Sequence, residues 1–180
     1  MIIKDYQLIN SLNSDTFQSF LIYGPNEGLV RENINIVYDN FSKGSDTEKV
    51  NISGKQLDEN VSVLHDEISA ISLFSEKKFI VLESIKEKHA SIIEDILILD
   101  CKNTCMVIKE SNLTKSSKIR KLYENSKNHF SLACYDDDIK VLSSLLEKFQ
   151  KQYNISFDSD VKSFLLNNLS NDRMVIKNEL

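Results

Sequence analysis

Five short apolar runs within the first 135 residues place the strongest constraint on the fold. Each run has the length of a buried strand and little of the polar alternation of a strand with one face in solvent. Strands of this kind belong to sheets that helices cover on both faces, so the runs predict a mostly parallel five-stranded sheet. The runs are Phe20–Tyr23, Lys49–Ile52, Phe79–Leu82, Thr104–Ile108 and Phe130–Cys134.

The segments between these runs have the period of amphipathic helices. Apolar residues recur at helical spacing over 29–41, 57–71, 92–99 and 119–123. Ser53 followed by Gln56 fits a capping box at the start of the second helix. Strands that alternate with helices imply parallel pairing and right-handed crossovers. The sequence therefore predicts an α/β domain with helices on both faces of the sheet.

The strand pattern stops after Tyr135. Helices are predicted at roughly Asp137–Tyr153 and Asp158–Leu169, and a third begins near Asn171 and reaches Leu180. An α/β domain over 1–136 and a small all-α lid domain over 137–180 together give the organisation of an AAA+ module, a P-loop NTPase-like fold. Because the third helix would need partners beyond Leu180, we expect the lid domain to be incomplete and the chain to be a fragment.

The residues after the first run resemble a nucleotide-binding P-loop that lacks its reactive side chains. A working loop reads Gly-x-x-x-x-Gly-Lys-Ser/Thr between a strand and a helix. Here the residues from Gly24 read Gly-Pro-Asn-Glu-Gly-Leu-Val-Arg, so Val30 stands at the lysine position and Arg31 at the hydroxyl position. We expect an ATPase-like scaffold that does not hydrolyse ATP. The residues of this degenerate nucleotide loop are Gly24, Pro25, Gly28, Val30 and Arg31.

The other parts of an ATPase centre are also incomplete. An active enzyme of this class carries paired acids after an apolar run as magnesium ligands, whereas Phe79–Leu82 is followed by Glu83 and then Ser84. Ser111 and Asn112 stand where a polar sensor of nucleotide would lie, and we interpret them as a turn. We therefore expect no cofactor. Weak anion binding at the helix start is the remaining functional interpretation of the loop.

Composition and charge exclude several classes of protein. The net charge of −5 over 180 residues lacks the basic balance of a general nucleic-acid-binding domain. No run reaches the about 18 apolar residues of a transmembrane helix. The start of the chain carries Asp5 and no long apolar segment, so it does not predict a signal peptide. A cytoplasmic location, without a membrane partner, follows by default.

Cysteines and histidines give no metal-binding or catalytic pattern. Cys101 and Cys105 are four residues apart with no further ligand nearby, and Cys105 and Cys134 lie in apolar runs, where cysteine behaves as a small buried hydrophobe. The histidines are dispersed, with no carboxylate or cysteine at ligand or triad spacing; they are His65, His89 and His129. We expect no metal site and no catalytic residue.

Four short segments coincide in order and spacing. They are Phe20–Arg31, Ser72–Leu82, Leu113–Leu122, and Asn171-Asp172-Arg173 followed by Asn178-Glu179-Leu180. Together they resemble, over the whole chain, the delta subunit of bacterial DNA polymerase III, which is part of the clamp loader. A delta subunit is normally longer and has a C-terminal helical collar domain, which is absent from this sequence.

The resemblance implies a role in DNA replication. Delta subunits bind the ring-shaped sliding clamp, which is the beta subunit, and favour its open form for loading on primed DNA. Their partners in the loader are delta-prime and the ATP-binding gamma/tau subunits, and they meet primed DNA only within that assembly. The resemblance thus implies a non-catalytic subunit of a DNA-directed DNA polymerase (nucleotidyltransferase) holoenzyme, with a degenerate ATP site of its own.

Leu73 and Phe74, preceded by Ser72, are the sharpest candidate site. The pair lies between a predicted helix and a predicted strand, among polar residues. On sequence alone, a Leu-Phe pair is more often part of the core, where it would cap the sheet. The resemblance implies the opposite interpretation, an exposed pair, because a Leu-Phe pair at this position is the family's anchor on the clamp.

A basic stretch over 109–121 is a weaker candidate. Most such charge lies on a solvated helix face. The functional alternatives are a subunit interface and contacts to DNA phosphates. The candidate residues for these contacts are Lys115, Lys118, Arg120 and Lys121.

Two other functions are compatible with the sequence. One is an active AAA+ ATPase with an unusual site, which Val30 and Arg31 disfavour. The other is a DNA-binding, initiator-like AAA+ protein, which would bind DNA as an isolated chain in a salt-dependent manner.

Overall fold

The computed structural model of the chain describes residues 1–11, 18–70, 75–99, 101–136, 139–168 and 176. Within these residues a single sheet of six strands has the order β1-β6-β2-β5-β4-β3, and every pair in it is parallel. The strands are β1 (Ile2–Ile3), β2 (Gln18–Tyr23), β3 (Thr47–Ser53), β4 (Lys77–Glu83), β5 (Thr104–Glu110) and β6 (Phe130–Ala133). All five predicted strands are confirmed, and so is their parallel pairing.

The prediction of five strands was wrong by one, because β1 adds a sixth. Ile2 and Ile3 pair with Ser131 and Leu132 of β6. The Met1 ammonium group donates hydrogen bonds to backbone carbonyls near the start of β6, at 2.8 Å from Ser126 O and 2.7 Å from His129 O. A strand of two residues is too short to give a periodic pattern, so the sequence could not indicate it.

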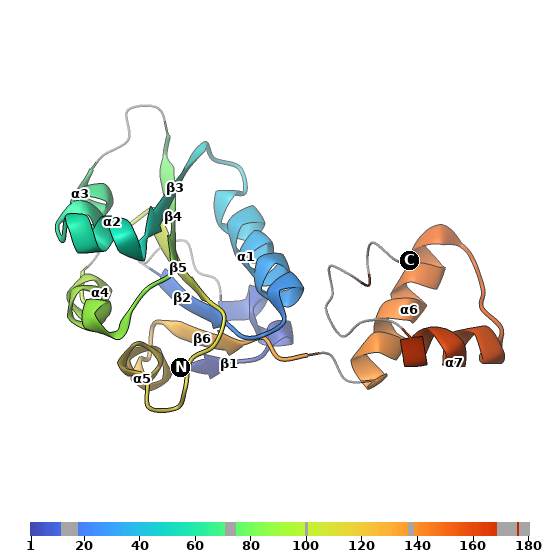
Figure 1. Ribbon diagram of the computed structural model, residues 1–180. Helices are drawn as coiled ribbons and strands as arrows, with labels where there is room; N and C mark the ends of the chain where they lie inside the picture. Colours follow the sequence, from blue (N-terminus) through green and yellow to red (C-terminus); the bar gives the residue numbers. More distant parts are fainter. Residues whose placement is uncertain (12–17, 71–74, 100, 137–138, 169–175, 177–180) are drawn as a thin grey trace.

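The helices cover both faces of the sheet. Figure 1 shows α1 on one face and α2 to α5 on the other. The helices around the sheet are α1 (Glu27–Ser42), α2 (Gly54–Glu59), α3 (Val63–Ser69), α4 (Ala90–Leu97) and α5 (Lys118–Asn125), with short 3₁₀ helices η1 (Asp5–Gln7), η2 (Ile9–Ser11) and η3 (Glu87–His89). This arrangement is the predicted βα alternation.

One predicted helix is two helices in the structure. The apolar period over 57–71 favoured a single helix, but Asn60 has an extended backbone (φ −142°, ψ 104°) and separates α2 from α3. Its side chain accepts a hydrogen bond from Ser62 N at 3.1 Å, a local contact that competes with helix continuation. Ser53 and Gln56 do form the predicted capping box, with Gln56 Oε1 2.8 Å from Ser53 N.

Successive residues of the central strands alternate between two apolar cores. On β2, Phe20 and Ile22 pack on the α1 side, and Leu21 and Tyr23 pack on the side of α2 to α5. All six residues of β2 are buried, which explains why the run showed no polar alternation. The thiols of Cys105 and Cys134 are buried as expected, and none of the three cysteines forms a disulfide within the described residues.

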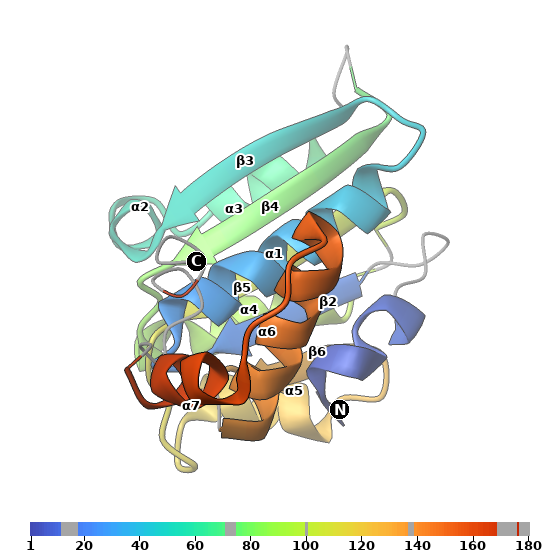
Figure 2. The same ribbon diagram turned by 90° about the vertical axis from the view of Figure 1, so that its right-hand side faces the viewer.

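Two further helices, α6 (Ile139–Tyr153) and α7 (Ser159–Asn168), follow the sheet and pack on each other (Figure 2). Leu142 and Leu146 of α6 are buried, and Lys162 Nζ of α7 lies 3.0 Å from Glu147 Oε1. Both helices agree with the predicted ranges. The predicted third helix starts outside the described residues. None of the described helices is both long and apolar enough to cross a membrane.

A buried hydroxyl pair connects α5 to β2. The Tyr123 and Ser19 hydroxyl oxygens are 2.5 Å apart, and neither residue has exposed surface. We expect Tyr123→Phe to lower the free energy of unfolding by about 1–3 kcal/mol, because it leaves the Ser19 hydroxyl buried without this partner. Urea denaturation measures the change. The Ser19→Ala, Tyr123→Phe double variant should recover part of the loss, and a Tyr123→Phe variant as stable as the parent would contradict the role of this contact.

Candidate functional site

The turn between β2 and α1 is held against the ends of two neighbouring strands. Gly24 N donates to Glu110 O of β5 at 3.1 Å, and Asn26 N donates to Cys134 O, just after β6, at 3.2 Å. The Asn26 side chain caps α1 by accepting a hydrogen bond from Leu29 N at 2.9 Å. The turn therefore occupies the position of a P-loop, between a buried strand and a helix N-terminus.

Gly24 is required by this arrangement for two reasons. Its φ of 150° is one that residues with a side chain rarely adopt, and a Cβ placed there would lie 1.9 Å from Cys134 O. The backbone approach, rather than a ligand, therefore accounts for this glycine. Gly28 is buried in the first turn of α1, and Pro25 is exposed.

The side chains at the lysine and hydroxyl positions of the loop cannot do what those two residues do in a working P-loop: valine carries no charge, and arginine has no hydroxyl to hold magnesium. Val30 is only 2% exposed and packs in the apolar core on the α1 side of the sheet. Arg31 is exposed on the first half of α1. The nucleotide-loop residues are thus divided among the core, the turn and the surface.

A small cavity of about 170 Å³ lies beside this turn, at the carboxyl ends of β2, β4 and β5. In parallel α/β sheets, ligands commonly bind at this edge. The cavity has three carboxylates and one ammonium group on its wall. The lining residues are Gly24, Glu27, Val30, Glu83, Ser84, Lys109, Glu110 and Ser111.

Contacts within the chain already engage the charged groups of the cavity. Lys109 Nζ lies 3.5 Å from Glu83 Oε1. Glu110 accepts a hydrogen bond from Ile85 N, and partial burial raises the pKa of its carboxyl above the usual range. Glu27 stands in the first turn of α1, where its charge is favourable to the helix dipole. Negative charge therefore already occupies the place where a phosphate group would need positive charge.

Sequence reasoning identified Glu83 but missed Glu27 and Glu110 as neighbours of the loop. The apolar run that indicated β5 ends at Ile108, whereas the strand continues to Glu110 and brings its side chain to the cavity. Ser111 borders the same cavity. No motif indicates these residues. They could have been found because the carboxyl ends of parallel strands meet at the same edge of a sheet.

Ser72, Leu73 and Phe74, the predicted clamp-binding residues, lie outside the described residues. The structure does describe both flanking stems. Helix α3 ends at Ser69 and is followed by Ala70, and β4 begins at Lys77. Since β4 runs from Lys77 to Glu83, these stems are at the opposite edge of the sheet from the carboxylate-lined cavity.

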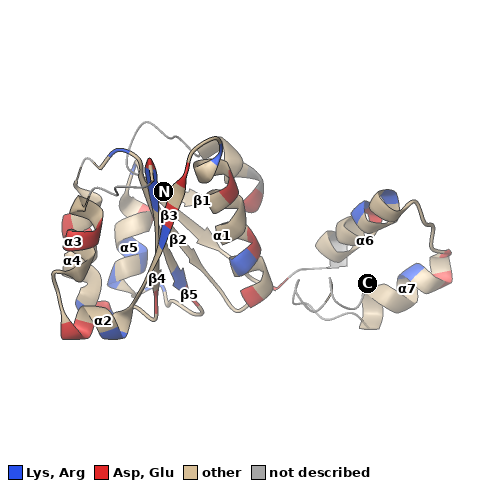
Figure 3. Cartoon of the chain, turned by 90° about the horizontal axis from the view of Figure 1, so that it is seen from above, with Lys and Arg blue, Asp and Glu red and all other residues tan. Residues whose placement is uncertain are grey.

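The basic residues of the stretch 109–121 have different environments. Lys115, Lys118 and Lys121 are exposed, and those on α5 are among the blue positions of Figure 3. Arg120 is held within the fold: its Nε lies 2.7 Å from Glu124 Oε1, and its Nη1 donates to Leu113 O at 3.2 Å. Its guanidinium also lies 5.2 Å from the centre of the Tyr23 ring. Arg120 thus stabilises the end of β2.

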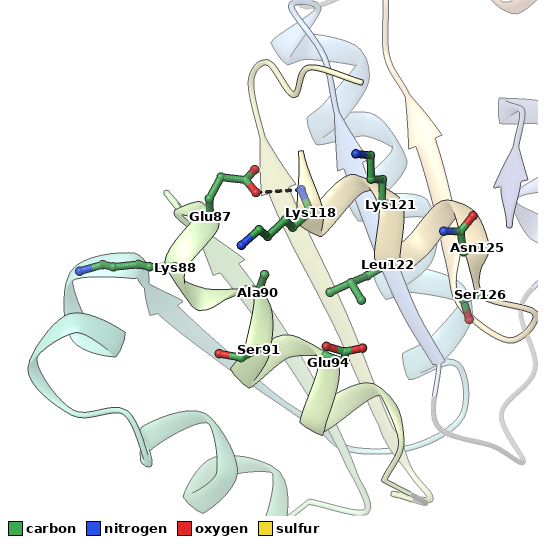
Figure 4. Close-up of a pocket in the computed structure, with 10 residues that line it drawn as sticks. All are labelled: Glu87, Lys88, Ala90, Ser91, Glu94, Lys118, Lys121, Leu122, Asn125 and Ser126. Carbon is green, nitrogen blue, oxygen red and sulfur yellow. Dashed lines mark hydrogen bonds between the residues drawn. The ribbon is translucent and has the colours of Figure 1, made fainter. Parts of the chain in front are cut away.

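A wider groove of about 670 Å³ separates α5 from η3 and α4 (Figure 4). Lys118 and Leu122 face α4 across it, and Lys118 N donates to Glu87 Oε2 at 2.8 Å. Its lining includes both glutamates and lysines, so the groove has no surface of one sign. The lining residues are Glu87, Lys88, Ala90, Ser91, Glu94, Lys118, Lys121, Leu122, Asn125 and Ser126.

One histidine has a carboxylate partner that the sequence did not indicate. His89 Nε2 lies 2.7 Å from Asp58 Oδ1, and His89 Nδ1 accepts a hydrogen bond from Lys86 N at 3.1 Å. Lys88, Lys86 and His89 hold the pKa of Asp58 well below its usual range. The cluster fastens α2 to η3. Among the described residues, no group of three or more His, Cys, Asp or Glu side chains could hold a metal ion.

The described residues have a parallel α/β fold similar to those of solved clamp-loader and replication-initiator structures. The sequence model of the family described as "DNA polymerase III, delta subunit" matches residues 20–135, which is more than half of the chain. The chain therefore belongs to the DNA polymerase III delta subunit family. No curated protein matches it in sequence.

Solved structures agree with this fold. The Bacillus subtilis DNA clamp loader delta protein is similar with a TM-score of 0.59 and 13% identity, over 97% of this chain and 54% of that one. Replication initiator DnaA bound to AMPPCP and single-stranded DNA has a TM-score of 0.58 and 12% identity, over 97% and 58%. AMPPCP-bound DnaA from Aquifex aeolicus has a TM-score of 0.53 and 14% identity, over 97% and 57%. The chain spans little more than half of each.

The close approach at Gly24 can be tested by substitution. We expect Gly24→Ala to lower the free energy of unfolding by about 3 kcal/mol or more, because strain and steric overlap both arise. Gly44→Ala is the matched control: Gly44 also has positive φ (76°), but a Cβ there meets nothing within 4 Å, so only about 1–2 kcal/mol of backbone cost is expected. Equal losses in urea denaturation would contradict the close approach.

Proposed function

We propose that this chain is a non-catalytic subunit of the DNA polymerase III clamp loader, which binds the sliding clamp and favours its open form for loading on primed DNA. The match of residues 20–135 to the delta family carries this proposal. Its partners would be the beta clamp, delta-prime and the gamma/tau subunits. The described residues of 1–136 would form the AAA+ domain, and those of 137–180 would form part of a helical lid domain.

The cavity beside Gly24 supports a subunit without ATP turnover. A triphosphate would meet the carboxylates of Glu27, Glu83 and Glu110, and Lys109 is already paired with Glu83. A like-charge contact at about 4 Å costs about 1 kcal/mol in water and about 4 kcal/mol at the effective dielectric of a protein surface. Val30 provides no compensating charge. ATP bound by partner subunits would then control when the clamp-binding surface is exposed.

The absence of nucleotide binding is directly measurable. Isothermal titration of the chain with ATP and Mg²⁺ should give no saturable heat, and no ATP turnover should be detected. A Glu27→Gln, Glu110→Gln variant should bind inorganic pyrophosphate at least about thirtyfold more tightly than the parent, because removing two repulsive contacts of about 1 kcal/mol or more each is worth at least about 2 kcal/mol. ATP turnover by the unmodified chain alone would instead favour the active ATPase.

Leu73 and Phe74 are the proposed clamp anchor, with Ser72 beside them. Burying each of the two apolar side chains in a pocket on the clamp would contribute about 1.5–3 kcal/mol, enough for binding hot spots. A subunit that binds the open shape of the ring more tightly than the closed shape shifts the ring toward opening by that difference in affinity. No bond chemistry is required of the chain itself.

The anchor is tested by a double substitution. Leu73→Ala with Phe74→Ala should weaken binding to the cognate sliding clamp by more than about a hundredfold, since about 3–6 kcal/mol is lost. Surface plasmon resonance on immobilised clamp measures the affinity, and circular dichroism verifies the fold. Val161→Ala with Phe164→Ala is the matched control, since it truncates two exposed apolar side chains on α7. Unchanged affinity in the Leu73, Phe74 variant would reject the anchor.

We also propose contacts to neighbouring subunits or DNA phosphates, within the assembly, by Lys115, Lys118 and Lys121, which are exposed. Arg120 is the weakest of the four candidate basic residues, because its guanidinium already contacts Glu124 and Leu113 O. Salt-dependent DNA binding by the isolated chain would favour the initiator-like alternative.

A further inference from the structure

The groove between α5 and α4 has one basic and one acidic wall. The α5 wall carries Lys118 and Lys121, and the wall formed by η3 and α4 carries Glu87 and Glu94. Lys88 also lines the groove, but its ammonium group lies 2.5 Å from Asp58 Oδ1 of α2, and its side chain points away from α5 (Figure 4). The second wall is therefore acidic on the side that faces α5.

Glu94 and Lys121 are the groove charges that are not neutralised within the chain. Both side chains are exposed, and neither forms an ion pair with another described residue. Glu87 and Lys118 are instead joined to each other, because the Glu87 carboxylate accepts a hydrogen bond from Lys118 N at 2.8 Å. The groove thus keeps one negative and one positive group available on its two sides.

Apolar surface lies between these two charges. Ala90 is buried at the start of α4, and Leu122 of α5 is partly buried and packs against the core below. Figure 4 shows the Leu122 side chain directed from α5 toward α4. Ser91, also on α4, is small and exposed. A groove of about 670 Å³ between two neighbouring helices can receive a ridge of side chains from another helix.

The charge pattern of this surface is complementary to itself. A two-fold axis through an apolar centre brings the acidic side of one copy against the basic side of the other, and the reverse contact forms at the same time. A partner of one charge sign, such as a run of phosphate groups, would be repelled by one of the two walls. The pattern therefore favours a second copy of this chain as the occupant.

We infer that the groove is a self-association surface of this chain. In the dimer, α5 of each copy enters the groove of the other, Leu122 packs over Ala90 of the other copy, and Glu94 pairs with Lys121 of the other copy. This inference does not depend on the proposed function. Because Lys121 is covered in the dimer, self-association and the contacts proposed for this lysine within the loader exclude each other.

Charge reversal tests the inference by sedimentation velocity of the chain alone, between about 1 μM and 1 mM. We expect the parent to dimerise with increasing concentration, and less at high salt. Glu94→Lys and Lys121→Glu should each weaken dimerisation about tenfold or more, because each replaces two attractive contacts by two repulsive ones. Both residues are exposed, so circular dichroism should show an unchanged fold.

An equimolar mixture of the two variants should dimerise about as well as the parent. In the mixed dimer, the lysine introduced into one copy faces the glutamate introduced into the other, and the second pair is the original one. The matched controls are Glu59→Lys and Lys55→Glu, which make the same changes in net charge at an exposed pair on α2, outside the groove. Each control should dimerise like the parent, with no gain on mixing.

A variant without a change of charge keeps the test decisive if a charge reversal does not fold. Ser91→Tyr places a large side chain at the exposed face of α4 that lines the groove. We expect it to weaken dimerisation about tenfold, because the entering helix meets a steric obstacle.

Three results would overturn the inference. One is a parent that stays monomeric up to about 1 mM, including the case in which Glu94→Lys weakens binding to delta-prime, which would assign the groove to a different partner. Another is a mixture of the two charge variants that does not regain the dimer. The third is a dimer that survives each single variant, since its interface would then lie elsewhere. Clamp binding is measured separately, so its failure leaves this inference unchanged.

Discussion

The pairing of β2 with both β5 and β6 is the constraint on which the rest of the structure depends. Tyr23, the last residue of β2, is in register with Glu110 of β5 and Ala133 of β6. That register brings three strand ends together and leaves no room for a side chain at Gly24. The turn into α1 is consequently determined by backbone packing, and it would keep its shape without any ligand. The glycine at the start of this turn is therefore explained by backbone packing.

The two candidate sites are at opposite ends of the same strand. β4 begins beside the stems of the 71–74 segment and ends at Glu83, in the carboxylate-lined cavity. Residues at one of these two edges of the sheet can be substituted without disturbing the other edge, because the length of the sheet lies between them. The proposed clamp anchor and the loop beside Gly24 are therefore separated by the length of β4.

The sequence predicted the features that repeat and missed those that depend on few residues. Long apolar runs such as Phe79–Leu82 showed the sheet, and its parallel pairing followed from the intervening helices. The two-residue β1, the break at Asn60 and the carboxylate of Glu110 each depend on one or two residues. His89 and Asp58 are 31 positions apart, and Lys78 contacts carbonyls 8 and 11 positions before it, so no helix or strand period indicated these contacts. The placement of Leu73 and Phe74 remains a prediction from the family resemblance.

The adjacent lysines of β4 have a consequence for folding. Side chains of a strand alternate between its faces, so Lys77 reaches α1 on one side of the sheet and Lys78 reaches α3 on the other. A slip of β4 by one residue against β3 or β5 would exchange the two faces. Each ammonium group would then lie beneath the wrong helix, and one would enter an apolar layer without carbonyl partners. The lysine pair therefore disfavours the shifted register of β4 and favours the observed one.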